Sequence, residues 1–102
     1  MKRSFRGCVV QIDERQHAER RHEAATRLGD ALRALRHSRN LSQEQVALDA
    51  GLSVDTYGYL ERGQTPWGRD ANPRIDTLLR IFTVLGVDAP RLLREAETDG
   101  EK

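Results

Sequence analysis

Apolar residues recur along this chain at the three- and four-residue spacing of helices rather than the alternation of strands. The spacing predicts a first helix over residues 16–38, two short helices over about 42–50 and 54–62, and a fourth helix over 74–85. Asp88 and Pro90 suit the start of a short final helix. The stripes expected to face a core are Leu28, Leu32 and Leu35 in the first helix and Ile75, Leu78, Leu79, Phe82 and Leu85 in the fourth. The expected fold class is therefore all-α, with five helices.

Residues with capping chemistry stand at the boundaries of the short helices. Ser42 followed by Gln45 has the spacing of a capping box, and Ser53 suits the N-cap of the next helix. Residues that tolerate a left-handed backbone follow four of the segments: Asn40, Gly51, Gly63 and Gly86. Residues 64–73, which hold two prolines and a glycine, predict a loop.

The same pattern divides the chain into three regions. We expect residues 1–25 to be a basic arm or an extension of the first helix, residues 26–94 the folded domain, and residues 95–102 a polar tail. The apolar segment around Cys8 to Ile12 suits a short strand that pairs with a second copy or lies on the helices, and it equally suits a loose arm. Leu92 and Leu93 are expected to point back toward the core, although a dimer contact would use the same side chains.

Length and composition restrict the class of protein. The chain of 102 residues, 37% hydrophobic and 32% charged, is long enough for one small domain. No apolar run approaches the roughly 20 residues of a membrane span, so we expect a soluble, cytoplasmic protein with no membrane partner. Its single cysteine excludes intrachain disulfides and cysteine-based zinc modules. The histidines lack partners at ligand spacing, and no nucleophile or phosphate-loop motif occurs, so we expect no metal, no cofactor and no enzymatic activity. The histidines are His17, His22 and His37.

The net charge of +1 hides an asymmetry along the chain. Residues 1–40 hold ten basic against five acidic residues, and residues 41–102 hold seven against eleven. Most of the basic residues are arginines, whose forks suit phosphate, although a genome rich in G and C would produce the same bias. The arginines of the N-terminal region are expected either to follow a nucleic-acid backbone or to pair with acidic residues of their own helix.

The second and third predicted helices have the features of a helix-turn-helix. Such a unit needs a small residue where the helices cross and a residue of positive φ in the turn, and Ala47 and Gly51 supply them. It presents the outer face of its second helix, which fits the major groove of DNA. Many helical hairpins share these two residues, so the spacing alone is not decisive.

A longer set of motifs resembles the Xre/Cro/C1-type helix-turn-helix repressors over residues 26–94. The motifs are Leu28-Gly29-Asp30, LSQEQVALDAGLS from residue 41, Leu60-Glu61-Arg62-Gly63, Ile75-Asp76-Thr77-Leu78 and Leu85-Gly86-Val87. The resemblance implies a compact, lambda-repressor-like domain that binds double-stranded operator DNA as a homodimer and regulates transcription.

The resemblance also implies roles for individual residues. Gln43 matches a contact to the DNA backbone, and Ser53 matches an N-cap that also reaches phosphate, although capping alone explains it equally well. Arg36 and Glu61 match a salt bridge with a structural role. The positions expected to meet base edges are Val54, Asp55, Thr56 and Tyr59.

Some residues depart from the pattern of that family. Asp55 places a carboxylate where phosphates are dense, and Gly58 weakens the expected recognition helix. The loop over 64–73 is longer than in most members. We expect Arg69 to contact phosphate and Trp67 to anchor the loop on the core; alternatively the loop is a surface insertion in which Trp67 covers apolar side chains.

A second hypothesis is a protein-interaction module of the same fold. Asp55, the acidic C-terminal half and the apolar segment before Ile12 would suit an antitoxin or adaptor with weak or lost DNA reading. Its partner would be a toxin or a regulator.

Overall fold

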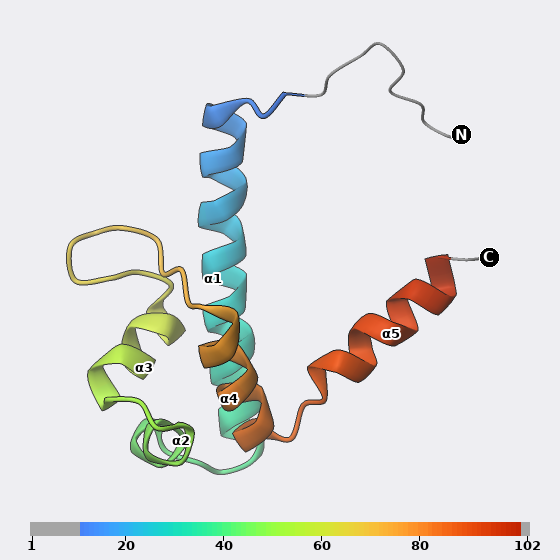
Figure 1. Ribbon diagram of the computed structural model, residues 1–102. Helices are drawn as coiled ribbons and strands as arrows, with labels where there is room; N and C mark the ends of the chain where they lie inside the picture. The colour runs from blue at the N-terminus through green and yellow to red at the C-terminus, as the bar shows by residue number, and fades with distance from the viewer. Residues whose placement is uncertain (1–10, 101–102) are drawn as a thin grey trace.

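The computed structural model describes residues 11–100, with side chains described as far as Glu95. This part of the chain is all-α and contains five helices (Figure 1). Their bounds are α1 Glu14–Ser38, α2 Gln43–Ala50, α3 Val54–Arg62, α4 Ile75–Leu85 and α5 Ala89–Gly100. The segment proposed as a strand or loose arm lies almost wholly outside the described residues.

Local capping chemistry explains where the short helices begin and end. The Ser42 hydroxyl accepts from the Gln45 amide and the Gln45 side chain accepts from the Ser42 amide, so the expected capping box is present. Ser53 caps α3 and Asp88 bonds to the amide of Arg91 in the first turn of α5. The expected left-handed stops are all present: Asn40, Gly51, Gly63 and Gly86 have φ of 56, 74, 76 and 77°.

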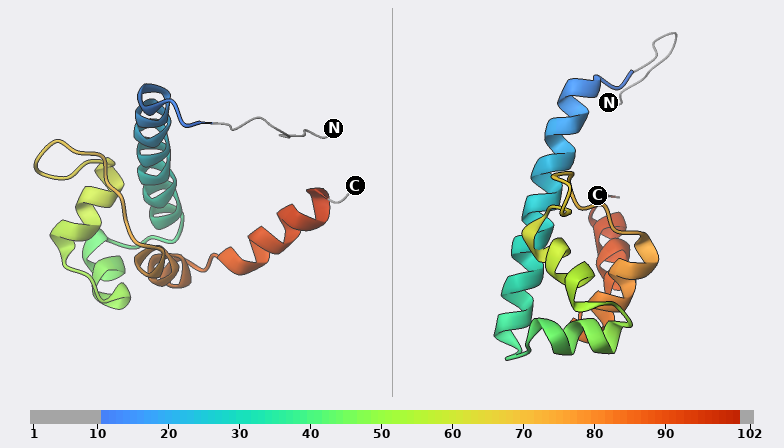
Figure 2. Two further views of the ribbon diagram at one scale, coloured as in Figure 1. Left: turned by 45° about the horizontal axis from the view of Figure 1, so that its top comes forward. Right: turned by 90° about the vertical axis from the view of Figure 1, so that its left-hand side faces the viewer.

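The polar first half of α1 is helical and rises beyond the other helices (Figures 1 and 2). Asp13 caps it by accepting from the amides of Arg15 and Gln16. Before Leu28 only Ala25 of this helix is buried. The first half of α1 is therefore almost entirely a solvent-exposed extension.

Gly29 marks the point where α1 meets α3. A Cβ added there would collide with the Glu61 carbonyl and lie 2.7 Å from the Leu60 carbonyl oxygen. Gly29 is therefore what lets the end of α3 pack directly on the backbone of α1.

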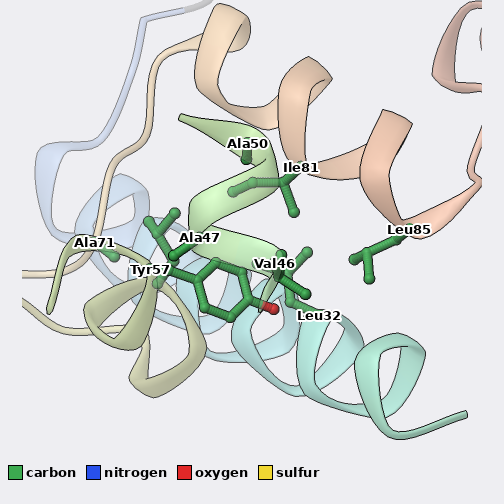
Figure 3. Close-up of a cluster of buried hydrophobic side chains, with 9 residues drawn as sticks. Leu32, Val46, Ala47, Ala50, Tyr57, Ala71, Ile81 and Leu85 are labelled. Atoms are coloured by element: carbon green, nitrogen blue, oxygen red, sulfur yellow. The ribbon is translucent and has the colours of Figure 1, made fainter. Parts of the chain in front are cut away.

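The core lies where α1, α2, α3 and α4 meet (Figure 3). Its fully buried side chains include Leu32 of α1, Val46 of α2, Tyr57 of α3, and Ile81 and Leu85 of α4. Each of the helices α1 to α4 thus contributes to the core. The pair of short helices α2 and α3 is fixed against both flanking helices, α1 and α4.

Two expectations about the apolar faces are wrong. Ile75 is 75% exposed and Leu79 is 41% exposed, while Ile81, outside the expected stripe, is completely buried. The inward face of α4 is therefore rotated from the predicted stripe. Leu92 and Leu93 are 56% and 69% exposed, so they do not point into the core. Helix α5 also continues through Gly100 instead of giving way to a tail at residue 95, and it projects away from the other helices (Figure 1).

Candidate nucleic-acid interface

The turn between α2 and α3 is set by one glycine. Gly51 takes φ 74° and donates its amide to Leu48, and the Leu52 amide then donates to the Ala47 carbonyl at 2.8 Å. Ala47 itself is completely buried. A small crossing residue and a left-handed turn therefore hold α3 at a fixed angle to α2, as the sequence predicts.

Helix α3 has one face in the core and one in solvent. Tyr57, Leu60 and Glu61 are buried at 0%, 5% and 3% exposure. The opposite face begins at the N-terminal end with Val54, which is 42% exposed, and continues through Asp55 and Thr56, with Tyr59 half-buried at its edge. The four residues expected to meet bases thus lie on the accessible side of the helix.

Two interactions orient the polar groups of this face. The Ser53 hydroxyl accepts from the Thr56 amide at 3.0 Å and donates to the Thr56 hydroxyl oxygen at 2.8 Å, which leaves the Thr56 hydroxyl hydrogen available. The Arg62 guanidinium lies 5.1 Å from the centre of the Tyr59 ring, at cation–π distance. Thr56 and Tyr59 are therefore held in place before any ligand arrives.

A buried ion pair fixes the other side of α3. Arg36 of α1 donates to both carboxylate oxygens of Glu61, at 2.6 and 3.1 Å, and its third donor bonds the Leu41 carbonyl at 2.9 Å. Arg33 adds a 2.7 Å bond to the Glu61 carbonyl. The ion pair expected between Arg36 and Glu61 is present, and it joins α1 to the C-terminal end of α3.

Titration of this cluster follows from its surroundings. Burial opposes ionisation of Glu61, but hydrogen bonding by Arg36 and the other polar neighbours outweighs it, so the pKa of Glu61 is lowered. Burial raises the pKa of Tyr57, and the nearby Glu61 carboxylate raises it further. The Tyr57 hydroxyl has no hydrogen-bond partner of standard geometry within the described residues. At neutral pH the cluster is a carboxylate, a guanidinium and a neutral phenol.

Gln43 has a structural contact that its position in the sequence did not reveal. Its side-chain amide donates to the Glu61 carboxylate at 2.9 Å, so it ties the start of α2 to α3. As the first residue of α2, its backbone amide is one of those that an α-helix leaves without an internal partner. The backbone amide, more than the side chain, is the group at this position that is free for phosphate.

The segment after α3 closes on itself. Gln64 and Asp70 form an antiparallel bridge, the Thr65 amide donates to the Arg69 carbonyl, and the Arg69 amide donates to the Thr65 hydroxyl. Trp67 lies near the tip of this loop and is 82% exposed. Both expectations for Trp67 are therefore wrong: it neither anchors the loop on the core nor covers apolar side chains. Arg69 is exposed, as a phosphate contact requires.

Asp70 ties the loop to the first half of α1. Its carboxylate oxygens lie 2.7 Å from His22 Nδ1 and 3.5 Å from Arg21 Nε, and only 15% of its side chain is exposed. Sequence reasoning missed this cluster because Asp70 and His22 are 48 residues apart and share no motif. The basic composition of α1 was its only signal.

Comparison with protein families agrees with the fold and with the arrangement of α2 and α3. A model described as a helix-turn-helix domain matches residues 27–96. The chain belongs to this helix-turn-helix domain family. No curated protein sequence matches the chain closely enough to be reported as a relative.

The helix-turn-helix domain carries several arginines whose charge is paired along α1. Arg27 bonds Glu23 at 2.9 Å and Arg33 bonds Asp30 at 3.1 Å, so part of the basic surface is neutralised as the helical spacing predicts.

Among the residues that the structure describes, no group of three metal-binding side chains occurs. In the same part of the chain, no helix has the length and apolar character to cross a membrane.

Proposed function

We propose that this helix-turn-helix domain is a sequence-specific DNA-binding transcriptional regulator of the Xre/Cro/C1 type that acts as a repressor. The observation that carries the proposal is the solvent-facing side of α3, which is held by a buried ion pair and a fixed turn while its polar side chains stay accessible. Preorganised side chains on a rigid helix are what direct reading of base edges requires.

In this proposal the N-terminal half of α3 enters the major groove. Thr56 and Tyr59 donate or accept hydrogen bonds at base edges, and Val54 contacts a thymine methyl group. Asp55 accepts from the exocyclic amino group of a cytosine, which would offset the repulsion between its carboxylate and the phosphates. Base preference therefore depends chiefly on Thr56 and Tyr59, with a cytosine contact from Asp55, whose charge also limits the overall affinity.

Contacts to phosphate set the register of the domain on the duplex. The free amides at the start of α2, beside Gln43, and Ser53 at the start of α3 face two stretches of the backbone in this arrangement. Arg69, exposed on the loop after α3, supplies a third contact. These contacts carry affinity and salt dependence rather than sequence preference.

We further propose that the domain binds as a homodimer through α5. Leu92 and Leu93 are 56% and 69% exposed on a helix that projects away from the core (Figure 2). Pairing with α5 of a second copy would cover them and place two α3 helices on one DNA face. The two half-sites should then be about one helical turn, roughly 34 Å, apart.

The test is fluorescence anisotropy of the protein with a labelled duplex from upstream of its own gene and with a scrambled duplex of equal composition. Each is titrated at low and near-physiological salt, because salt weakens backbone attraction more than base reading. We expect the upstream duplex to keep a preference of at least tenfold at the higher salt. Equal release of both duplexes would contradict base reading by α3.

Thr56→Ala is the variant that assigns this preference to α3. We expect it to reduce discrimination between the two duplexes by roughly 5- to 20-fold, since a single hydroxyl contact lies in the lower half of the about 1–3 kcal/mol that a good base contact contributes. Thr83→Ala, which removes an exposed threonine from α4 whose hydroxyl bonds its own helix, is the matched control and should leave the preference unchanged.

A further inference from the structure

The loop between α3 and α4 carries a large aromatic side chain held in solvent. We propose that Trp67 joins Arg69 in contacting DNA, with the indole packed on deoxyribose sugars beside the groove that α3 enters. The inference rests on the proposed function, and it adds to that function an element that increases affinity without reading sequence.

The loop is ordered by its own backbone before any partner arrives. The Gln64 to Asp70 bridge closes it, the Gly68 amide donates to the Thr65 carbonyl at 3.1 Å, and the Ala71 amide donates to the Gly63 carbonyl at 2.9 Å. A tryptophan that is 82% exposed on an ordered loop is well suited to binding a partner. The entropy cost of ordering the loop is already met in the free protein and does not reduce the affinity.

Charge around the tryptophan selects an anionic partner. Arg69 is exposed two residues along the chain, whereas the one carboxylate of the loop, Asp70, is paired with Arg21 and His22 of α1. The loop therefore presents an aromatic ring and an exposed guanidinium, with its negative charge neutralised from behind. Aromatic side chains combined with arginine are a recurrent way of binding nucleic acid, in which the arginine attracts the backbone and the ring packs on an apolar surface of the nucleotides.

The position of the loop selects DNA among anionic partners. The loop protrudes on the same side of the molecule as α3, on the side away from α5 (Figures 1 and 2). A shallow, mostly apolar groove of about 260 Å³ lies between α3 and the base of the loop. Its lining includes Thr56 and Tyr59 of α3 together with Thr65, Pro73 and Arg74 of the loop. The base of the loop therefore borders the face of α3 that would meet the duplex, and Trp67 and Arg69, which do not line the groove, lie further along the loop.

In this arrangement the first half of α1 supports the loop. Beyond its single buried residue, Ala25, it contributes little to the core, yet Arg21 and His22 hold Asp70 of the loop. The extension acts as a brace that sets how far Trp67 stands from the helix-turn-helix. The tryptophan is placed by two elements that a minimal domain of this kind would not need.

Trp67 is the only tryptophan of the chain, so its fluorescence reports on the loop alone. The experiment follows acrylamide quenching of the full-length protein with and without the upstream duplex and a mixed-sequence duplex. We expect both duplexes to shield the ring and to shift its emission. Anisotropy with the same duplexes then compares Trp67→Ala, Trp67→Phe and the wild type.

Trp67→Ala should weaken binding of both duplexes by roughly 5- to 10-fold, near the lower end of what aromatic contacts to nucleic acid contribute. The preference between the duplexes should stay as in the wild type, because the contact reads no bases. Trp67→Phe should restore most of the lost affinity. Arg69→Ala should reduce the slope of log affinity against log salt by about one phosphate contact.

The outcomes separate this inference from the function on which it rests. If the wild type discriminates between the duplexes while Trp67 stays open to acrylamide and Trp67→Ala binds normally, the loop contact is overturned and the regulator stands. If the wild type binds neither duplex, both are overturned. If Trp67 becomes shielded as protein concentration rises without DNA, the loop is an interface between copies and the DNA contact is overturned.

Discussion

The contact between α1 and α3, here called the seam, is closely packed, whereas the projecting helix α5 leaves apolar side chains uncovered. In the seam, Gly29 lets the helix backbones touch and Arg36 holds Glu61 out of solvent. In α5, Leu92 and Leu93 remain in solvent. The difference indicates that the seam stabilises the monomer, whereas α5 leaves uncovered the leucines that the proposed dimer would use.

The largest expected effect comes from breaking the ion pair of the seam. Glu61→Ala leaves Arg36, a residue that is only 9% exposed, without its partner carboxylate, and such losses cost about 3–5 kcal/mol. Urea denaturation followed by circular dichroism measures the change. Asp76→Ala, which removes an exposed i,i+4 pair with Arg80, is the matched control and should cost about 0.5 kcal/mol or less.

The same ion pair gives the seam a pH dependence. Because the pKa of Glu61 is lowered from 4.5 in the folded protein, its stabilising effect is complete above that value and is lost as pH falls through the lower folded pKa. We expect the wild type to lose stability more steeply than Glu61→Gln as the pH falls below 4.5. Parallel curves for the two proteins would contradict the assignment.

A smaller loss is expected from adding one methyl group to the seam. Gly29→Ala puts a Cβ against the Leu60 and Glu61 carbonyls, which cannot move without shifting α3, and overpacking of this kind costs about 1–3 kcal/mol. Thermal unfolding measures the loss. An unchanged midpoint would show that the helices can separate at this point without cost.

The same substitution in α3 should have the opposite sign. At Gly58 a Cβ would lie 3.6 Å from an Arg62 side-chain nitrogen and 3.9 Å from a Gln43 side-chain oxygen, which is ordinary contact. Gly58→Ala is therefore expected to stabilise the domain by up to about 1 kcal/mol, the helix propensity difference. Chemical denaturation of Gly29→Ala and Gly58→Ala side by side makes the comparison, and a loss at both sites would contradict it.

The smallest effect on monomer stability is expected in α5. Leu92→Lys with Leu93→Lys removes no core contact, so unfolding at concentrations where the wild type is monomeric should change by about 0.5 kcal/mol or less. Light scattering at higher concentration should show that the double variant does not form the proposed dimer. A large destabilisation of the monomer would instead place these leucines in the core of the domain.

Local chemistry explains which parts of this structure the sequence could predict. Capping by Ser42 and Ser53 and the turn at Gly51 depend only on neighbours in the chain. The types and spacing of these residues are therefore sufficient to predict the helix ends. The pairing of Arg36 with Glu61 joins residues 25 apart and followed only from resemblance to a known family.

The remaining features depend on how the helices pack, which spacing does not determine. In α4 the choice of Ile81 over Ile75 for the core reflects the rotation of the helix against α2, and both residues fit a helical stripe. Trp67 is exposed because its loop closes on its own backbone. The residue type alone favours burial of a tryptophan, so the sequence predicts the opposite. Of the candidate DNA contacts, the sequence predicted the accessible face of α3 but not the bond from Gln43 to Glu61.

The attachment of Asp70 to Arg21 and His22 also bears on how this protein can change over evolutionary time. A substitution that removes the carboxylate leaves an arginine and a histidine of α1 without their partner, and a change in α1 leaves a poorly exposed acid unpaired in the loop. Two segments 48 residues apart are therefore expected to vary together. Relatives that lack the loop are expected to lack the basic pair on the first helix as well.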